Sequence, residues 1–133
     1  MDKNILIEKA FEARENAYVP YSGFKVGACI YTTDGNYIMG ANIENAAYGS
    51  TNCAERSAVF AAYSLGYRKE DIDAIAIVAK SDRISTPCGS CRQVLSELIS
   101  EDTPVFLSNG RETKTTNMKE LLPDHFGAEN LKA

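Results

Sequence analysis

Histidine is scarce in this chain of 133 residues, since its single copy is His125, near the C-terminus. Long hydrophobic runs are also missing, because none approaches the ~20 residues that a membrane-spanning helix needs. Basic residues number 14 against 18 acidic ones, and the net charge of -4 argues against a protein whose main task is to bind a phosphate backbone. Residues 1–4 lead into an amphipathic segment and not into a signal peptide. We therefore expect a cytoplasmic protein with neither membrane nor nucleic-acid partners.

The chain has enough apolar residues to build a core. Hydrophobic residues make up 44% and charged residues 24% of the sequence, which is typical of a folded protein. A chain of this length forms one domain of ordinary size. We expect residues 1–133 to fold as a single domain.

Hydrophobic spacing predicts helices and strands in the order αββαβαββα. The expected helices are 4–18, 53–65, 88–99 and 118–122, and the expected strands are 24–31, 37–41, 72–79, 104–107 and 111–116. Thr51 or Asn52 is expected to cap the second helix, and Pro87 is expected in the first turn of the third. Helices that link the central strands predict a parallel crossover and helices on both faces of the sheet. The turn signal Asn109-Gly110 predicts that the last two strands are antiparallel. The expected fold is α/β, with three α/β/α layers and a five-stranded mixed sheet.

The cysteines carry the most specific signal in the sequence. Cys88 and Cys91 form a C-x-x-C pair, which indicates metal or redox chemistry more than a disulfide. The segments C-A-E at 53–55 and P-C-G-S-C at 87–91 both begin predicted helices, where the helix dipole favours thiolates. If the two helix starts meet at one end of the sheet, Cys53 supplies a third sulfur. Zinc is the natural metal for such a set.

Three ligands without a fourth are typical of an open, catalytic zinc site, whereas structural sites are closed by four. The remaining thiol, Cys29, lies in the middle of a predicted strand, and we expect it to be a buried apolar residue. Glu55, two residues after Cys53, is placed to move a proton of a water in the open position.

Two arginines can correct the charge of such a centre. Zinc with three thiolates carries a charge of about -1, which makes it a poor Lewis acid. Arg56 stands three residues after Cys53, and Arg92 stands four residues after Cys88, so that each can reach a sulfur on its helix face. We expect both guanidinium groups to donate to thiolates and to draw charge from the metal.

These motifs resemble those of a known family. C-A-E followed by P-C-x-x-C is similar to the zinc-dependent nucleobase deaminases, in the form that uses three cysteines. The segments 20–28, 42–48 (N-I-E-N-A-A-Y) and 91–94 narrow the resemblance to the small cytidine deaminases. The resemblance spans residues 11–126.

The resemblance implies hydrolysis of cytidine and deoxycytidine to uridine and deoxyuridine, with release of ammonia, in pyrimidine salvage. It makes Cys53, Cys88 and Cys91 the ligands of one zinc ion per subunit, and Glu55 the proton shuttle. It further implies a homotetramer with shared active sites.

Six residues are implied as substrate contacts by the same resemblance. Asn42 and Glu44 would hold the ribose hydroxyls, Phe24 would pack against the nucleoside, and the Ala54 backbone would contact the base. The other two are residues that would act on a neighbouring subunit's nucleoside: Tyr48 and Phe126.

Other interpretations stay open from the sequence. The C-x-x-C pair could be a redox pair, or the cysteines could hold a structural zinc in a module used for protein contacts. A deaminase of another aminopyrimidine or of a nucleoside antibiotic would share the zinc motifs. The connection between the last two predicted strands, at Asn109-Gly110, is short, and acidic residues outnumber basic ones. Both features favour a free nucleoside over a polynucleotide as the substrate.

Overall fold

Five strands form one sheet at the centre of the structure, a computed structural model that describes residues 1–132. The strands are β1 (Val26–Thr32), β2 (Tyr37–Ala41), β3 (Ile72–Ala79), β4 (Val105–Ser108) and β5 (Thr113–Thr116). Their order across the sheet is β2-β1-β3-β4-β5. Strands β3 and β4 are parallel, and the other neighbouring pairs are antiparallel. The mixed sheet, the crossover and the antiparallel last pair are therefore confirmed.

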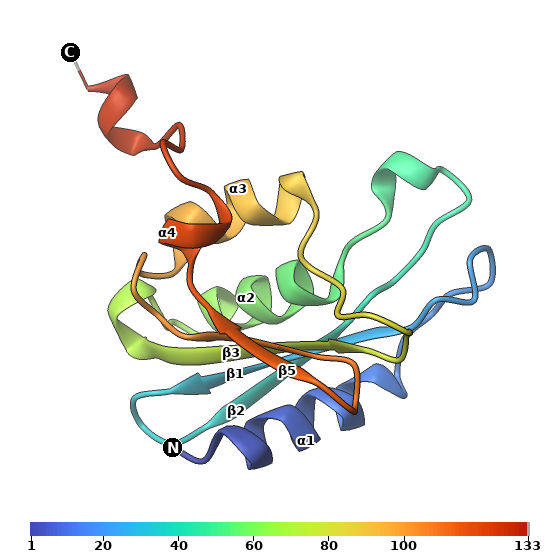
Figure 1. Cartoon of the computed structure of the whole chain (residues 1–133). Helices are drawn as coiled ribbons and strands as arrows, with labels where there is room; N and C mark the ends of the chain where they lie inside the picture. Colours follow the sequence, from blue (N-terminus) through green and yellow to red (C-terminus); the bar gives the residue numbers. More distant parts are fainter. Residues whose placement is uncertain (133) are drawn as a thin grey trace.

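Helices lie on both faces of this sheet. The α-helices are α1 (Lys3–Arg14), α2 (Ala54–Ser64), α3 (Gly89–Leu98) and α4 (Met118–Leu121). Helix α1 lies against one face, and α2 and α3 lie against the other (Figure 1). Three short 3-10 helices, which the sequence did not predict, occur at Tyr48–Ser50, Lys69–Asp71 and Ala128–Leu131. The predicted order of helices and strands is confirmed.

Strand β3 separates two hydrophobic clusters, because its side chains alternate between the faces. Ile75 and Ile77 pack with residues of α2 and α3, whereas Ala74 and Ala76 pack with residues of α1. Asp73 is its only exposed residue. The apolar run 72–79 is thus a strand buried on both faces, with the predicted bounds.

The residues that begin α2 and α3 differ from those predicted. Thr51 or Asn52 was expected to cap the second helix, but Cys53 is the N-cap, and Asn52 pairs with Ile43. Pro87 was expected in the first turn of α3, but it lies just before the N-cap, Cys88. Both cysteines therefore stand at the first free backbone N–H groups of a helix.

The first helix is shorter than predicted. It was expected to continue to residue 18, but it ends at Arg14. Asn16 and Ala17 form turn hydrogen bonds to carbonyls three residues back, and the backbone N–H of Tyr18 donates to Asn42. The hydrogen bond from Tyr18 to Asn42 takes the place of a bond that would continue the helix. It also brings the segment that contains Asn42 beside the end of α1.

Gly40 lets α2 lie directly on strand β2. A Cβ atom at this position would stand 2.4 Å from the backbone nitrogen of Ala58 and 2.6 Å from the carbonyl oxygen of Ala54. Both atoms belong to the backbone of α2, so a flexible side chain cannot relieve the clash. The close approach places the first turn of α2, which carries Glu55, against the sheet.

Gly40→Ala is therefore expected to lower the free energy of unfolding by about 1–3 kcal/mol or more, as overpacking typically does. Denaturant titration measures the change. Gly49→Ala is the control, because a Cβ there meets nothing within 4 Å. Equal unfolding midpoints for the two variants would show that the approach of α2 to β2 is not tight.

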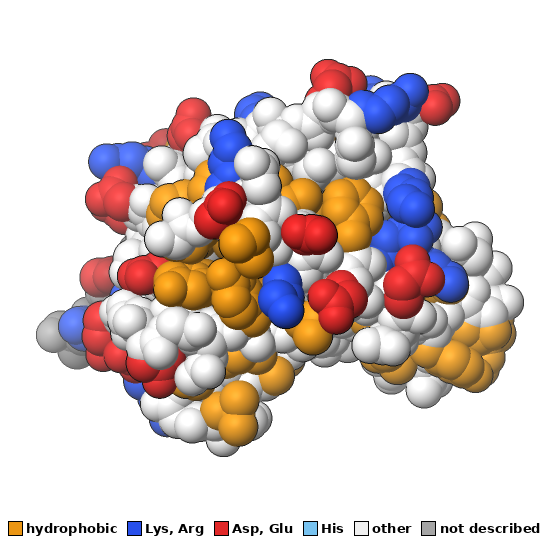
Figure 2. Space-filling model, turned by 90° about the horizontal axis from the view of Figure 1, so that it is seen from below, with side chains coloured by type: hydrophobic (Ala, Val, Ile, Leu, Met, Phe, Trp, Pro, Cys, Tyr) orange, Lys and Arg blue, Asp and Glu red, His pale blue; other side chains and the backbone are white. Residues whose placement is uncertain are grey.

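Charge is mixed on the face that carries α1. Figure 2 shows acidic and basic side chains side by side with apolar ones on this face, and the basic groups do not gather into a continuous patch there. Within residues 1–132, none of the helices has the length and hydrophobicity needed to span a membrane.

Candidate active site

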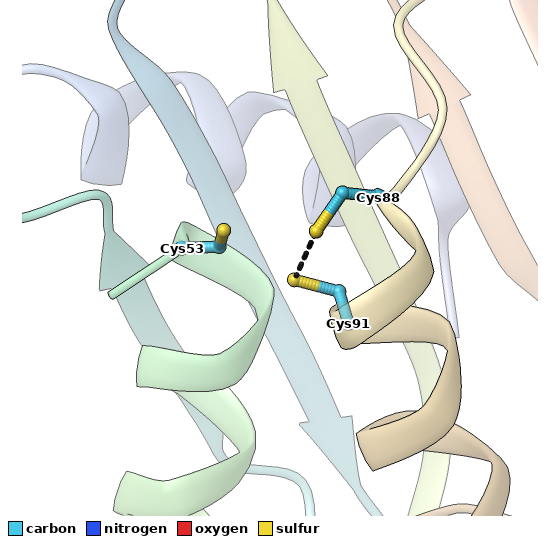
Figure 3. Close-up of side chains that lie close together, drawn as sticks. All are labelled: Cys53, Cys88 and Cys91. Carbon is cyan, nitrogen blue, oxygen red and sulfur yellow. Dashed lines mark hydrogen bonds between the residues drawn. The ribbon is translucent and has the colours of Figure 1, made fainter. Parts of the chain in front are cut away.

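Three cysteine sulfurs meet where α2 and α3 begin. Cys53 is the N-cap of α2, Cys88 is the N-cap of α3, and Cys91 lies in the first turn of α3. Their sulfur atoms lie within 4.8 Å of one another, and those of Cys88 and Cys91 are 3.5 Å apart. Figure 3 shows the three side chains pointing toward a common centre. The predicted meeting of the two helix starts is confirmed.

This sulfur set fits a zinc ion. A tetrahedral site with Zn–S bonds of about 2.3 Å has sulfurs about 3.8 Å apart, close to the spacing observed. All four cysteines are free thiols. Among the described residues, no other group of three His, Cys, Asp or Glu side chains gathers in this way. The donor set thus has three sulfurs and an open side.

Cys29 takes no part in this cluster. It is fully buried in the cluster that packs against α1, on the other face of the sheet. Burial raises the pKa of its thiol to about 12. As expected, Cys29 is a buried apolar residue that stays protonated.

Arg56 contacts the sulfur of Cys53. Its Nη2 donates to the sulfur of Cys53 across 3.4 Å. The pKa of Cys53 is lowered to about 5, first by a hydrogen bond from Cys91 and then by Arg56, while the pKa of Cys91 is raised. The guanidinium of Arg56 is therefore placed to stabilise negative charge on the sulfur of Cys53.

The structure does not bring Arg92 to the sulfurs. Its Nε donates to the carbonyl of Pro87, one Nη donates to the carbonyl of Leu121, and the other donates to the hydroxyl of Thr86. The expected bond from Arg92 to a thiolate is absent among the hydrogen bonds of the described residues. Arg92 instead ties the approach to α3 to the end of α4.

Glu55 is buried beside the sulfurs. Its side chain is only 4% exposed, and it lines the same pocket as Cys53 and Cys88. Burial raises the pKa of this carboxyl group to about 7, and the neighbouring charge of Cys53 also raises it. A carboxyl group with this pKa can both accept and donate a proton near neutral pH.

A pocket of about 300 Å³ opens in front of these residues. Four of the six expected substrate contacts line it, namely Phe24, Asn42, Glu44 and Ala54. This volume lies at the lower end of the range for small-molecule sites. The pocket therefore suits a small ligand held between the sulfurs and a polar wall.

Asn42 and Glu44 are held by the segment that carries Phe24. Asn42 donates to the carbonyl of Phe24 and accepts from the backbone of Val26. Glu44 accepts from the backbone N–H groups of Tyr21 and Ser22 and from the hydroxyl of Ser22. The hydrogen bonds lower the pKa of Glu44, so that it is ionised at neutral pH.

Ser22 is a pocket residue that sequence reasoning did not single out. Its hydroxyl donates to Glu44 and accepts from the backbone N–H of Phe24 across 3.0 Å. It therefore links two of the expected substrate contacts. The sequence feature that could have indicated Ser22 is its position in the polar segment just before Phe24.

Tyr48 and Phe126 lie outside the pocket of their own chain. Neither lines it, and their side chains are 61% and 58% exposed. Tyr48 packs edge-on against Tyr21, with ring centroids 6.2 Å apart. The backbone carbonyl of Phe126 accepts a hydrogen bond from Gln93. Both aromatic rings are thus available to another molecule.

The sequence and the fold are similar to those of known proteins. Residues 1–107 match the family model described as the cytidine and deoxycytidylate deaminase zinc-binding region. A cytidine deaminase of Halalkalibacterium halodurans is 54% identical over 132 residues, which cover 98% of each chain. The crystal structure of cytidine deaminase from Burkholderia pseudomallei has a TM-score of 0.92 and 48% identity, over 95% of this chain and 100% of that one. That of the Mycobacterium tuberculosis enzyme has a TM-score of 0.82 and 38% identity, over 96% of this chain and 98% of that one. This chain therefore belongs to the zinc-dependent cytidine and deoxycytidylate deaminase family.

Proposed function

We propose that the protein is a zinc-dependent cytidine deaminase that hydrolyses cytidine and deoxycytidine to uridine and deoxyuridine, with release of ammonia, in pyrimidine salvage. The observation that carries this proposal is the meeting of three cysteine sulfurs and the buried Glu55 in one pocket. Neither a redox pair nor a closed structural zinc site requires a buried carboxyl group beside the sulfurs. The pocket also has room for a ligand, which a structural module does not need.

Cys53, Cys88 and Cys91 are the proposed ligands of one zinc ion per chain. Bound zinc lowers the pKa of water and so supplies a nucleophile at neutral pH. The helix N-termini at Cys53 and Cys88 and the guanidinium of Arg56 offset the charge of the thiolates.

Glu55 is the proposed proton carrier. Its carboxylate accepts a proton from the attacking water and delivers it to N3 of the cytosine ring, which makes C4 more electrophilic. After attack at C4, Glu55 takes the remaining proton from the added hydroxyl, which becomes the carbonyl oxygen of uridine. It passes this proton to the exocyclic amine, which leaves as ammonia when the C4–N bond breaks. Burial, which raises its pKa to about 7, suits a group that must change its protonation state repeatedly.

Asn42 and Glu44 are proposed to hold the ribose, with Phe24 against the nucleoside and the backbone of Ala54 at the base. The Oε2 atom of Glu44 accepts from Ser22 alone, so it keeps a lone pair for a ribose hydroxyl. Polar groups built to bind a hydroxyl discriminate strongly against analogues that lack it. A free base is therefore expected to be a poor substrate.

Arg56 is expected to act through the metal centre and not on the substrate. Arg56→Ala should lower kcat or zinc affinity by about 10- to 100-fold, as the loss of a group that supports a metal ligand typically does. Arg56→Gln should be milder, because an amide still donates to sulfur. Kinetics and elemental analysis measure both effects. Two variants equal to wild type in activity and zinc content would make Arg56 a plain surface charge.

The proposed assembly is a homotetramer with shared sites. We interpret the helices on the two faces of the sheet as the three-layer α/β/α arrangement of the family, and residues 1–133 as one catalytic domain. Tyr48 and Phe126, both exposed, are proposed to reach a neighbouring chain's nucleoside. Light scattering should give a mass near four chains, and full activity in a monomeric fraction would contradict shared sites.

The reaction is proposed to take place in the cytoplasm. Three unpaired thiols beside one another persist in a reducing compartment, whereas an oxidising one favours disulfides.

The proposed activity is tested directly with cytidine. Purified protein should lower the absorbance of cytidine and release one ammonia per uridine formed, and a chelator that removes zinc should abolish both changes. Cytosine is the matched control for the ribose contacts. Turnover that is unaffected by complete removal of zinc, or that is equal for cytidine and cytosine, would contradict the proposal.

A further inference from the structure

The loop between β3 and α3 forms one rim of the pocket. Ser85 and Thr86 line both the pocket and the adjoining hollow, as does Phe24 across from them. The loop has no helix or strand of its own over residues 80–87. Its position therefore depends on hydrogen bonds from other parts of the chain.

The second half of the loop over residues 80–87 is tied to α3. Arg92 donates to the hydroxyl of Thr86 and to the carbonyl of Pro87. Its first half is tied to the turn between β4 and β5. The side-chain amide of Asn109 donates to the carbonyls of Ser81 and Asp82, at 3.1 and 3.4 Å.

The topology explains why this turn reaches the loop. Strands β3 and β4 are parallel neighbours, so the segments that follow them leave the sheet at the same end (Figure 1). Ser108 is the last residue of β4, and Asn109 follows it directly. Side chains after parallel strands meet at this end, where ligands of open α/β sheets commonly bind.

The orientation of the Asn109 amide is fixed by its own turn. Its Oδ1 accepts the backbone N–H groups of Arg111 and Glu112, at 3.0 and 2.8 Å. The carbonyl end of the amide therefore faces these donors, and the NH₂ end faces the loop. The side chain is only 4% exposed, so water does not compete freely for its hydrogen bonds.

We infer that Asn109 is a positioning residue for the substrate, because it holds the loop that places Ser85 and Thr86 at the pocket rim. It lines neither the pocket nor the hollow itself and acts through the loop. The inference rests on the proposed function, since the ligand of the pocket is taken to be cytidine.

Asn109→Asp separates the two roles of this side chain. The carboxylate keeps both bonds within the turn, but it has no donor for the loop and turns an oxygen toward two carbonyls. KM for cytidine should rise about ten-fold, in line with the loss of a buried hydrogen bond, and kcat should stay within about two-fold. Amide hydrogen exchange over residues 81–86 should be faster, with zinc content unchanged.

Two further variants complete the test. Arg111→Ala, which removes an exposed hydrogen bond and an exposed ion pair to Asp82 but leaves both bonds from Asn109 to the loop, should match wild type. Asn109→Ser keeps a hydroxyl that can serve the turn but cannot reach the loop, so it should repeat the effect if Asn109→Asp does not fold.

An unchanged KM with unchanged exchange in the loop would overturn the inference. A fall in zinc content and kcat with KM unaltered would also overturn it, because the effect would then lie at the metal centre. If wild type itself does not convert cytidine, the proposed function fails, and hydrogen exchange in the loop still decides whether Asn109 holds it.

Discussion

Glu55→Gln is expected to keep the fold and one zinc ion per chain while lowering kcat by about 10²- to 10⁴-fold. The amide has nearly the shape of the carboxyl group, but it cannot take up and release a proton. Glu55 is not one of the three residues whose ligand atoms cluster, so its replacement leaves the sulfurs in place. The loss can exceed this range, because one residue serves several proton transfers. Steady-state kinetics measures kcat, and elemental analysis of the same sample measures the zinc content per chain.

Glu8→Gln is the matched control for this variant. Glu8 is exposed on α1, on the other side of the sheet from the sulfurs, so the same substitution should leave kcat unchanged. Near-normal turnover in Glu55→Gln would mean that another group carries the proton. Loss of zinc in that variant would mean that Glu55 supports the metal and not the chemistry.

Cys88→Ala is expected to remove zinc and activity together. Without one of three sulfurs, the site keeps two protein ligands, fewer than a catalytic zinc site has. Kcat should fall to background, a change as large as that from complete metal removal. Zinc per chain, measured after dialysis at neutral pH, should fall well below one.

Cys29→Ala serves as the control for the loss of a thiol. Its sulfur is buried on the α1 side of the sheet, so this variant should keep its zinc and its kcat, although a small cavity lowers stability. Unchanged zinc content after Cys88→Ala would rule out the three-cysteine site.

Strands β2 and β3 have the bounds that the sequence predicted, whereas β1 and β5 each begin two residues later than predicted and β4 begins one residue later. The continuous apolar run 72–79 has the same bounds as strand β3, since both faces of that strand are covered. Helix ends were harder to predict. Residues of ordinary capping type, Thr51 and Asn52, were expected to begin α2, but Cys53 is the N-cap, and the backbone of Asn52 pairs with Ile43.

The metal cluster followed from sequence because its spacing is local. Cys88 and Cys91 lie three residues apart at one helix start, and only the meeting of the two helices had to be assumed. The predicted contact between Arg92 and a sulfur is wrong. Its spacing from Cys88 was right for a contact, but the carbonyls of Pro87 and Leu121 bind its guanidinium instead.

The loops at the pocket rim could not be predicted from pattern. Ser22 reaches Glu44 across 22 positions in the chain, and Asn109 reaches Ser81 across 28. Hydrogen bonds over such separations depend on how the strands pair, and loop residues carry no periodic signal. The turn signal at Asn109-Gly110 predicted the hairpin but not the contact with the loop.

In the proposed reaction, zinc held by Cys53, Cys88 and Cys91 and the proton carrier Glu55 act together on cytidine. The most direct measurement is kcat for cytidine as a function of zinc bound per chain, over a series of samples partly depleted with a chelator and then restored. The plot should be a line through the origin that reaches full activity at one zinc per chain. Full activity at zero zinc, or no recovery when zinc is restored to a folded protein, would contradict it.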